Sequence, residues 1–387
     1  MGTSRARRGL PLIAAALTAI VVVGFVWLRA NGPHPSPAYP QPSPTPIVPG
    51  EYQVAYDFLT PALGWAVITD QLKGERTWVF KTTDGAHHWL RTFEGALAPP
   101  GARIHFVDRI HGYISVLFDH VIAFQTSDGG THWMSITFPA PPLALTYADP
   151  THAWCVSFST TAPLDLYASS DGGTTWTRKT FPGPAIDGYG KGGESTLAFR
   201  RDGEGWLGAM GDTPYAFVTN DGGGTWEPAP VAPATSPPLT KGGQVVGPAY
   251  AVRVELLPGE GTLAIVLNET TSFESGYTSF DGGSTWSLLS GPPSPAVWDD
   301  VSFLNRQEWW AFRFGFLFKT FDAGRNWRET HVAPLIESWS YSPAYVLDQK
   351  HAWSFMTHTG GGEAGTALSM TSDGGLSWHT VNVPQPG

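Results

Sequence analysis

An eight-residue segment recurs seven times along the chain, and this repeat constrains the fold more than any other feature. Each copy begins with Ser or Thr, carries Asp at its third position and ends in Trp. Successive copies are separated by intervals that range from 41 residues (Asp281 to Asp322) to 60 residues (Asp221 to Asp281). Regular recurrence at such a spacing indicates an array of similar structural units. The copies span 82–89, 126–133, 169–176, 219–226, 279–286, 320–327 and 371–378.

The octet has the chemistry of a tight turn. Its Asp can accept hydrogen bonds from backbone N–H groups a residue or two ahead. Its fifth position is Gly in every copy except the first, which has Ala86, and Gly adopts the positive φ that a tight turn demands. Its Trp offers a large apolar face for packing. We therefore predict a structural role for these residues: Asp84, Asp128, Asp171, Asp221, Asp281, Asp322, Asp373, Trp89, Trp133, Trp176, Trp226, Trp286, Trp327 and Trp378.

A second pattern precedes each octet. A short apolar strand ends near Asp or Asn, and a small residue followed by an aromatic one then opens the next strand, as in 106–108 before Gly112-Tyr113. The fifth repeat keeps the strands (253–257 and 262–266) without the tryptophan. Four short strands per repeat predict an all-β, seven-bladed β-propeller of four-stranded antiparallel blades. The position of the octet within each repeat predicts that every blade is built from consecutive strands, with no strand exchanged between the first blade and the last.

The first 50 residues differ in composition from the rest. Residues 9–28 carry no charged side chain and are long enough to span a bilayer as a helix, and Arg5, Arg7 and Arg8 precede them. Eight prolines fall within residues 31–50 and favour an extended spacer. We predict a cytoplasmic basic stub, a single-pass signal-anchor, a Pro-rich linker and an extracytoplasmic propeller at the cell membrane, with cleavage and secretion as the second choice. Their ranges are 1–8, 9–28, 29–50 and 51–387, with blades near 51–94, 95–139, 140–183, 184–233, 234–292, 293–333 and 334–387.

The octet resembles the Asp-box, or BNR repeat. The longer unit, best seen in residues 104–133 and 301–327, is most similar to the photosystem II stability and assembly factor-like family, and more distantly to sortilin-type and sialidase-type propellers. That resemblance implies a non-enzymatic propeller outside the cytoplasm that helps to assemble a membrane complex. This chain departs from the basic surface expected of the family, because its body is acidic. Sialidases carry a Phe/Tyr-Arg-Ile-Pro segment, whereas this chain has Ala102-Arg103-Ile104-His105.

Charge and motif content narrow the function classes. Removing the four arginines of the first 50 residues leaves 19 basic against 33 acidic residues, so nucleic acid is not an expected partner.

Asp299 and Asp300 are adjacent, and neighbouring strand residues point to opposite faces, so they do not form one catalytic dyad. His87-His88 is a weak metal signal without a third ligand, and the lone Cys155 is expected to be a small buried side chain. We predict no catalytic residue, no metal and no cofactor.

Aromatic residues outside the repeat give the functional lead. Trp298, Trp339, Tyr341 and Tyr189 fall in connections between blades, on one rim of the predicted propeller. Exposed aromatics there suit sugar stacking or peptide capture, although they can equally seal the gaps between blades. The sequence predicts a binding scaffold for a protein partner at the membrane surface. The alternative is a cell-envelope glycan-binding or glycoside hydrolase module.

Overall fold

The computed structural model describes most of residues 52–386, all within one unit, Gln41–Gly387. The predicted anchor (9–28) and linker (29–50) lie outside the described residues. Within the described part, no helix has the length and apolar character that a membrane crossing requires. The segments left out inside this range are 71–75, 99–100, 118–119, 159–163, 180–195, 210–213, 232–238, 242–243, 247–249, 269–272, 314–315, 332–338, 342–343 and 359–364.

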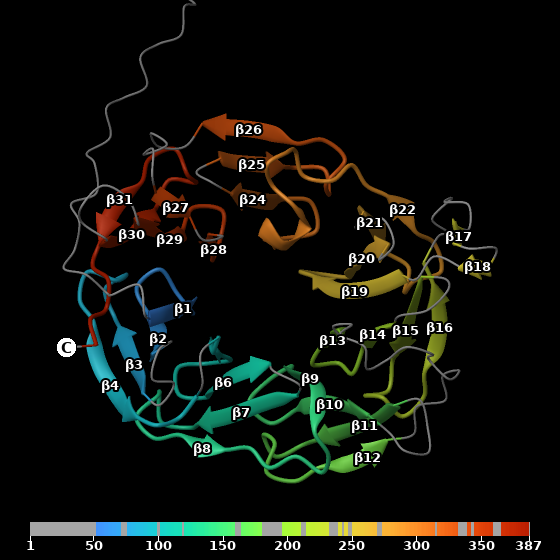
Figure 1. Ribbon diagram of the computed structural model, residues 1–387, viewed down its shortest axis with the longest axis horizontal. Helices are drawn as coiled ribbons and strands as arrows, with labels where there is room; N and C mark the ends of the chain where they lie inside the picture. Colours follow the sequence, from blue (N-terminus) through green and yellow to red (C-terminus); the bar gives the residue numbers. More distant parts are fainter. Residues whose placement is uncertain are drawn as a thin grey trace, which may run out of the picture. The chain divides into compact units, whose positions relative to one another are not determined.

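Seven antiparallel sheets follow one another along the chain and form the blades of a β-propeller, which confirms the predicted fold (Figure 1). The first strand of each blade lies toward the centre and the fourth lies outside (Figure 1). Blades 1 and 2 consist of β1 (Tyr52–Phe58), β2 (Gly64–Asp70), β3 (Thr77–Thr82), β4 (Leu90–Gly95), β5 (Arg103–Phe106), β6 (Gly112–Leu117), β7 (Val121–Thr126) and β8 (Met134–Ser135). Blades 3 and 4 consist of β9 (Pro142–Tyr147), β10 (Ala153–Phe158), β11 (Leu164–Ser169), β12 (Thr177–Lys179), β13 (Thr196–Phe199), β14 (Gly205–Ala209), β15 (Tyr215–Thr219) and β16 (Glu227–Pro230).

The second half of the ring carries two additions to this plan. A hairpin separates blades 4 and 5, and the first strand of blade 7 is split into β27 and β28, which both pair with β29. The hairpin is β17 (Leu239–Lys241) and β18 (Gln244–Val246). Blades 5 and 6 consist of β19 (Tyr250–Leu257), β20 (Gly261–Asn268), β21 (Phe273–Ser279), β22 (Ser287–Leu288), the 3₁₀ helix η1 (Trp298–Asp300), β23 (Val301–Phe303), β24 (Trp309–Arg313), β25 (Phe316–Thr320) and β26 (Arg328–His331). Blade 7 consists of β27 (Trp339–Tyr341), β28 (Tyr345–Val346), β29 (Ala352–His358), β30 (Gly365–Thr371) and β31 (His379–Val381).

Each octet forms the turn between the third and fourth strands of its blade. In blade 4, the Thr219 hydroxyl donates to Asp221 Oδ1 (2.8 Å) and accepts the buried Gly223 N–H (3.0 Å). The Thr225 N–H donates to Asp221 Oδ1 and its hydroxyl to Oδ2, both at 2.8 Å. These bonds from Thr225 and Thr219 lower the pKa of Asp221 to about 2. The aspartate thus accepts three hydrogen bonds within its own turn, which confirms its predicted structural role, but its backbone donor lies four residues ahead instead of one or two.

Three octets that lack Ser or Thr at the seventh position keep the same network. His88 Nδ1 and His132 Nδ1 each lie 2.6 Å from the second carboxylate oxygen of their aspartate. The Asn326 side-chain N–H₂ donates to Asp322 Oδ2 at 2.7 Å. The position therefore requires a hydrogen-bond donor of suitable reach, and imidazole and amide groups both supply one.

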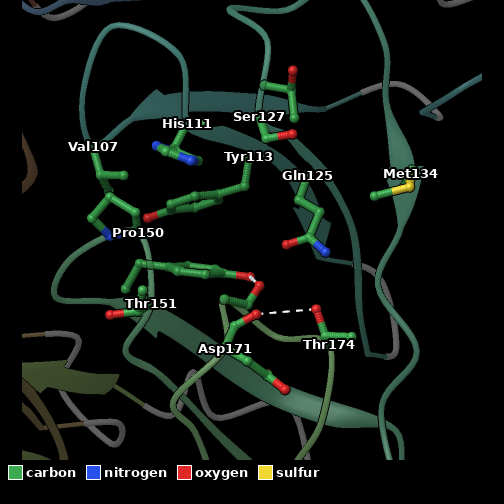
Figure 2. Close-up of a pocket in the computed structure, with 14 residues that line it drawn as sticks. Val107, His111, Tyr113, Gln125, Ser127, Met134, Pro150, Thr151, Asp171 and Thr174 are labelled. Atoms are coloured by element: carbon green, nitrogen blue, oxygen red, sulfur yellow. Dashed lines mark hydrogen bonds between the residues drawn. The ribbon is translucent and has the colours of Figure 1, made fainter.

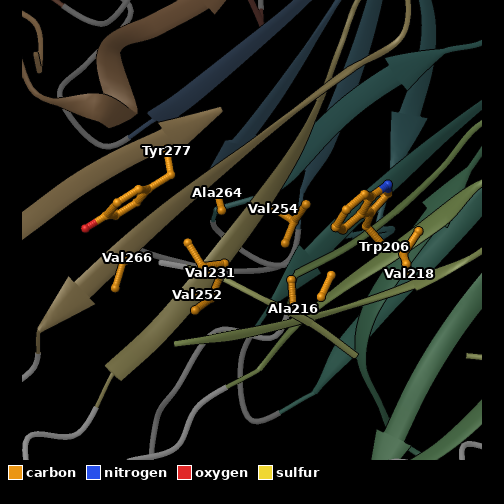
Figure 3. Close-up of a cluster of buried hydrophobic side chains, with 10 residues drawn as sticks. Trp206, Ala216, Val218, Val231, Val252, Val254, Ala264, Val266 and Tyr277 are labelled. Carbon is orange, nitrogen blue, oxygen red and sulfur yellow. The ribbon is translucent and has the colours of Figure 1, made fainter. Parts of the chain in front are cut away.

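Apolar side chains fill the spaces between neighbouring blades. The cluster between blades 4 and 5 illustrates this, because Trp206 of β14 and Val252 and Val254 of β19 are all buried in it (Figure 3). Burial of one such valine contributes about 1.5–3 kcal/mol relative to exposure. The blades therefore depend on their neighbours for their apolar cores.

Stacked aromatic rings recur where one blade meets the next. Trp65 of blade 1 stacks on Phe106 of blade 2 with ring centroids 3.7 Å apart, and Trp154 of blade 3 stacks on Phe199 of blade 4 at 4.0 Å. The Phe106 ring also covers Gly112 of its own blade, where an added Cβ would lie 2.7 Å from a ring carbon. This contact explains why a small residue precedes the aromatic one in the second sequence pattern.

The ring closes between blades 7 and 1 with the same stacking. Both blades are built from contiguous strands, as the phase of the repeat predicts. Phe58 stacks on Trp353 with centroids 3.7 Å apart. The Asn382 N–H donates to Ala86 O (3.0 Å), and the Trp89 indole donates to Asn382 O (2.8 Å), so the segment after β31 is tied to the first octet.

Candidate functional site

A cleft of about 370 Å³ lies between blades 2 and 3, on the face that carries the octets. Turn-to-turn bonds define this face, since the octet Gly129 N–H donates to Ile110 O in the β5–β6 turn (2.9 Å). Figure 2 shows Val107, Pro150 and Thr151 at one side of the cleft and Met134 across from them. The lining residues are Val107, His111, Gly112, Tyr113, Gln125, Thr126, Ser127, Met134, Tyr147, Pro150, Thr151, Asp171, Gly172 and Thr174.

Two tyrosines form the inner wall of the cleft. Tyr113 of β6 and Tyr147 of β9 stack with centroids 4.5 Å apart and an interplanar angle of 26°. The Tyr147 hydroxyl donates to the octet carbonyl Gly172 O at 3.3 Å, a long bond. The Tyr113 hydroxyl makes no hydrogen bond with any described residue. Burial, followed by the nearby Tyr147 and Asp57, raises the pKa of Tyr113 above its ordinary value, so this group is a neutral donor.

The other polar groups divide into occupied and open ones. Asp171 is occupied: the Thr175 hydroxyl and N–H and the Ser169 hydroxyl donate to its carboxylate, and in this order they lower its pKa to about 2. A general acid at neutral pH needs a raised pKa, so Asp171 does not suit that role. The Gln125 side-chain amide, in contrast, makes no hydrogen bond within the described part of the chain. The exposed Met134 marks the outer edge of the cleft.

His111 at the cleft belongs to a recurring turn. Its Nδ1 lies 2.8 Å from Asp108 Oδ2, and Asp108 also accepts the His111 N–H at 2.7 Å. The same Asp-x-x-His arrangement recurs in other blades at Asp149–His152 and at 348–351. Because it also occurs in blade 7, away from the cleft, it is a turn element, and we assign it no catalytic role.

Of the four aromatics predicted from the sequence, the structure describes the side chain of Trp298, which does not line this cleft. Trp298 lies in η1 and is buried, with 3% of its surface exposed, so the prediction of an exposed ring is wrong for this residue. Its ring covers Gly276, where an added Cβ would lie 2.1 Å from a ring carbon. Trp339 and Tyr341 lie in β27, but their side chains are outside the described part, as is the whole of Tyr189. A binding role for these three residues remains a prediction.

Asp299 and Asp300 point to different arginines. The exposed Asp299 forms an ion pair with Arg253, whereas the buried Asp300 lies 3.1 Å from Arg313 Nη1. Asp300 also accepts the Val297 N–H at 2.9 Å. The two carboxylates are thus engaged in separate ion pairs, and they lie in the 3₁₀ helix η1, not in a strand as the sequence argument assumed.

Two further residues singled out from the sequence have structural surroundings. Cys155 is buried in β10, and burial raises the pKa of its thiol to about 12. His88 is hydrogen-bonded to Asp84, and its neighbour His87 is exposed. Within the described residues, no three His, Cys, Asp or Glu side chains are grouped closely enough to hold a metal ion.

Sequence reasoning missed the cleft, although a signal for it is present. Blade 2 has Gly112-Tyr113 where blade 1 has Gly64-Trp65 and blade 3 has Ala153-Trp154. The predicted aromatics belong to the connections between blades, whereas the cleft lies among the octets and the turns between first and second strands. A departure from the repeat, rather than an addition to it, marks the site.

Comparison with known proteins supports the fold. No protein-family model and no curated protein matches the chain. The solved structure of YCF48 bound to D1 peptide has a TM-score of 0.52 and 16% identity, over 86% of this chain and 99% of that one. YCF48 from Cyanidioschyzon merolae gives 0.53 and 16%, over 86% and 98%. A GH74 xyloglucanase from Xanthomonas campestris gives 0.46 and 12%, over 90% of this chain and 70% of that one. At 16% identity, the similarity to the two YCF48 structures shows a shared propeller fold and nothing finer.

Proposed function

We propose that this protein is a non-enzymatic binding scaffold whose propeller holds a segment of a protein partner in the cleft between blades 2 and 3. The observation that carries the proposal is the cleft itself, about 370 Å³ in volume. It combines an exposed thioether (Met134) with a tyrosine hydroxyl (Tyr113) and a side-chain amide (Gln125) that bond to no described residue. Such a mixture of apolar surface and open hydrogen-bonding groups is typical of protein-binding sites.

The lining chemistry favours a protein segment over a glycan. Sugars stack on the open faces of aromatic rings, but Tyr113 and Tyr147 are stacked on each other. Methionine is adaptable and is enriched at protein interfaces. Among the described residues that line the cleft, the one carboxylate is that of Asp171, which is hydrogen-bonded within its own turn. A glycan-cleaving role would need a second carboxylate facing the same cleft.

The proposal places this scaffold at a membrane. Residues 9–28 would anchor the chain in the cell membrane, and residues 29–50 would hold an Asp-box propeller on the extracytoplasmic side, where it would act as an assembly or stability factor. One solved propeller of similar fold, YCF48, has been determined with a bound peptide, which supports peptide capture by such a fold as an analogy.

Site-specific photo-crosslinking tests the proposal. A photoreactive amino acid would replace Met134, and, in a control chain, Leu90. Both residues directly follow an octet tryptophan, and both are exposed, by 63% and 69%. The full-length chain would be irradiated in its native membranes, and the adducts would be purified and read by mass spectrometry. A chain lacking residues 1–50 would test the need for the anchor.

The proposal predicts one protein joined in stoichiometric amount through position 134 and absent at position 90. Loss of that adduct in the chain lacking residues 1–50 would support the membrane placement. Identical adducts from both positions would refute a partner site at the cleft. Absence of any protein adduct, together with retention of the propeller on cell-wall polysaccharide, would favour the glycan-binding alternative.

A further inference from the structure

The junctions on either side of the cleft share a bond that the cleft lacks. Between blades 1 and 2, the Trp65 indole N–H donates to the octet carbonyl Gly129 O at 2.9 Å. Between blades 3 and 4, the Trp154 indole donates to Gly222 O at 3.0 Å. In both junctions, therefore, an indole from the preceding blade is held against the octet of the following blade.

Between blades 2 and 3, a smaller side chain stands in the place of that indole. Tyr113 occupies the position after the small residue, which Trp65 and Trp154 occupy in their blades. Its ring stacks on the next blade at 4.5 Å, compared with 3.7 Å for Trp65. The equivalent octet carbonyl, Gly172 O, receives the 3.3 Å bond from Tyr147 and no indole N–H.

The side chain that precedes the octet is also shorter in blade 2 than in blades 1 and 6. The residue before the octet is Lys81 in blade 1 and Lys319 in blade 6. The Lys81 ammonium lies 5.1 Å from the Trp65 ring centroid, and the Lys319 ammonium donates to the octet carbonyl of Gly374 in blade 7. Gln125 holds this position in blade 2, and its amide reaches no such partner. At the junction between blades 2 and 3, both positions thus carry shorter side chains than in blade 1, and the cleft lies at this junction.

We infer that the cleft accepts the indole of a tryptophan on the partner segment, a specificity that rests on the proposed function. At the neighbouring junctions, an indole of the chain itself donates to the octet carbonyl. In the cleft, the indole of the partner would take that place. Gly172 O and the Gln125 side-chain oxygen are acceptors for its N–H. Met134 offers a thioether, which contacts aromatic rings favourably.

N-acetyl-tryptophanamide serves as the probe, with N-acetyl-phenylalaninamide and N-acetyl-leucinamide as comparisons. The full-length chain, labelled with ¹³C at the methionine methyl groups, would be titrated, and the Met134 signal would be assigned by Met134→Leu. We expect a saturable shift with the tryptophan probe. Affinity for the phenylalanine probe should be about fivefold weaker, because it lacks the indole N–H donor.

Two variants should close the cleft from within. Tyr113→Trp places an indole of the chain itself at this junction, as in blades 1 and 3. Gln125→Lys places before the octet the lysine that blades 1 and 6 carry. Each variant should abolish the probe-induced shift at Met134. Leu90→Ala, at the matched position of blade 1, should leave that shift unchanged. Gln125→Lys decides the outcome if Tyr113→Trp does not fold.

The inference is overturned if the Met134 signal responds equally to the tryptophan and leucine probes, if it responds to neither, or if Gln125→Lys binds the tryptophan probe like the unaltered chain. These outcomes would leave the proposed function standing wherever position 134 still crosslinks to a single protein. Failure of that crosslink, in contrast, would remove the proposed function itself.

Discussion

Replacing Thr82 by valine tests the role of the octet hydroxyl without changing the shape of the side chain. The Thr82 hydroxyl donates to Asp84 Oδ1 (3.0 Å) and accepts the buried Ala86 N–H (3.0 Å). Asp84 is 40% exposed, so water can replace the hydroxyl there. The Ala86 N–H is buried and would lose its acceptor, which costs about 1–3 kcal/mol. We therefore expect Thr82→Val to lower the free energy of unfolding by about 1–3 kcal/mol.

The adjacent residue is the matched control. Thr83 is exposed, and its side chain makes no hydrogen bond with the described residues, so Thr83→Val should change stability by less than about 0.5 kcal/mol. Both variants would be unfolded in urea and followed by tryptophan fluorescence, with the slope of the transition compared to ensure the same unfolding reaction. If Thr82→Val and Thr83→Val unfold at the same urea concentration, the octet hydroxyl does not stabilise its turn.

Three further predictions concern the ring and its interior. The pKa of Asp171 is lowered to about 2 in the folded state, below its unfolded value. The contribution of Asp171 to stability should therefore be full above pH ~4 and should be lost as the pH falls toward 2. A melting temperature that does not change between pH 5 and pH 2 would contradict this. Tyr345→Phe removes a hydroxyl that lies 2.8 Å from the buried Asp57 carboxylate, where blades 7 and 1 meet. It should lower the free energy of unfolding in urea by about 1–3 kcal/mol. Tyr52→Phe, whose hydroxyl has no partner among the described residues, should lower it little. Cys155, with its pKa raised to about 12 by burial, should react with a thiol reagent at pH 8 only after unfolding, and rapid labelling of the native chain would show that the strand opens.

The sequence by itself determined the repeat architecture. The octet turn depends on groups within a few residues of one another, such as Thr219, Asp221 and Thr225, so its geometry follows from local chemistry. The number of octets then gives the number of blades, and their phase gives contiguous blades and a ring closed without strand exchange. The seventh octet position shows the limit of pattern matching, because His88 and Asn326 provide the same donor as Ser or Thr.

The tertiary structure alone decided where a ligand could bind. Trp298 looked like a free aromatic in a connection between blades, but packing against Gly276 buries it. Tyr113 looked like an ordinary variation of the repeat, yet it leaves a cleft, because its ring meets Tyr147 of the next blade where Trp65 and Trp154 reach an octet carbonyl. The physical reason is that a turn is held by near neighbours in sequence, whereas a cleft depends on which side chains two separate blades bring together and on the volume those side chains leave unfilled.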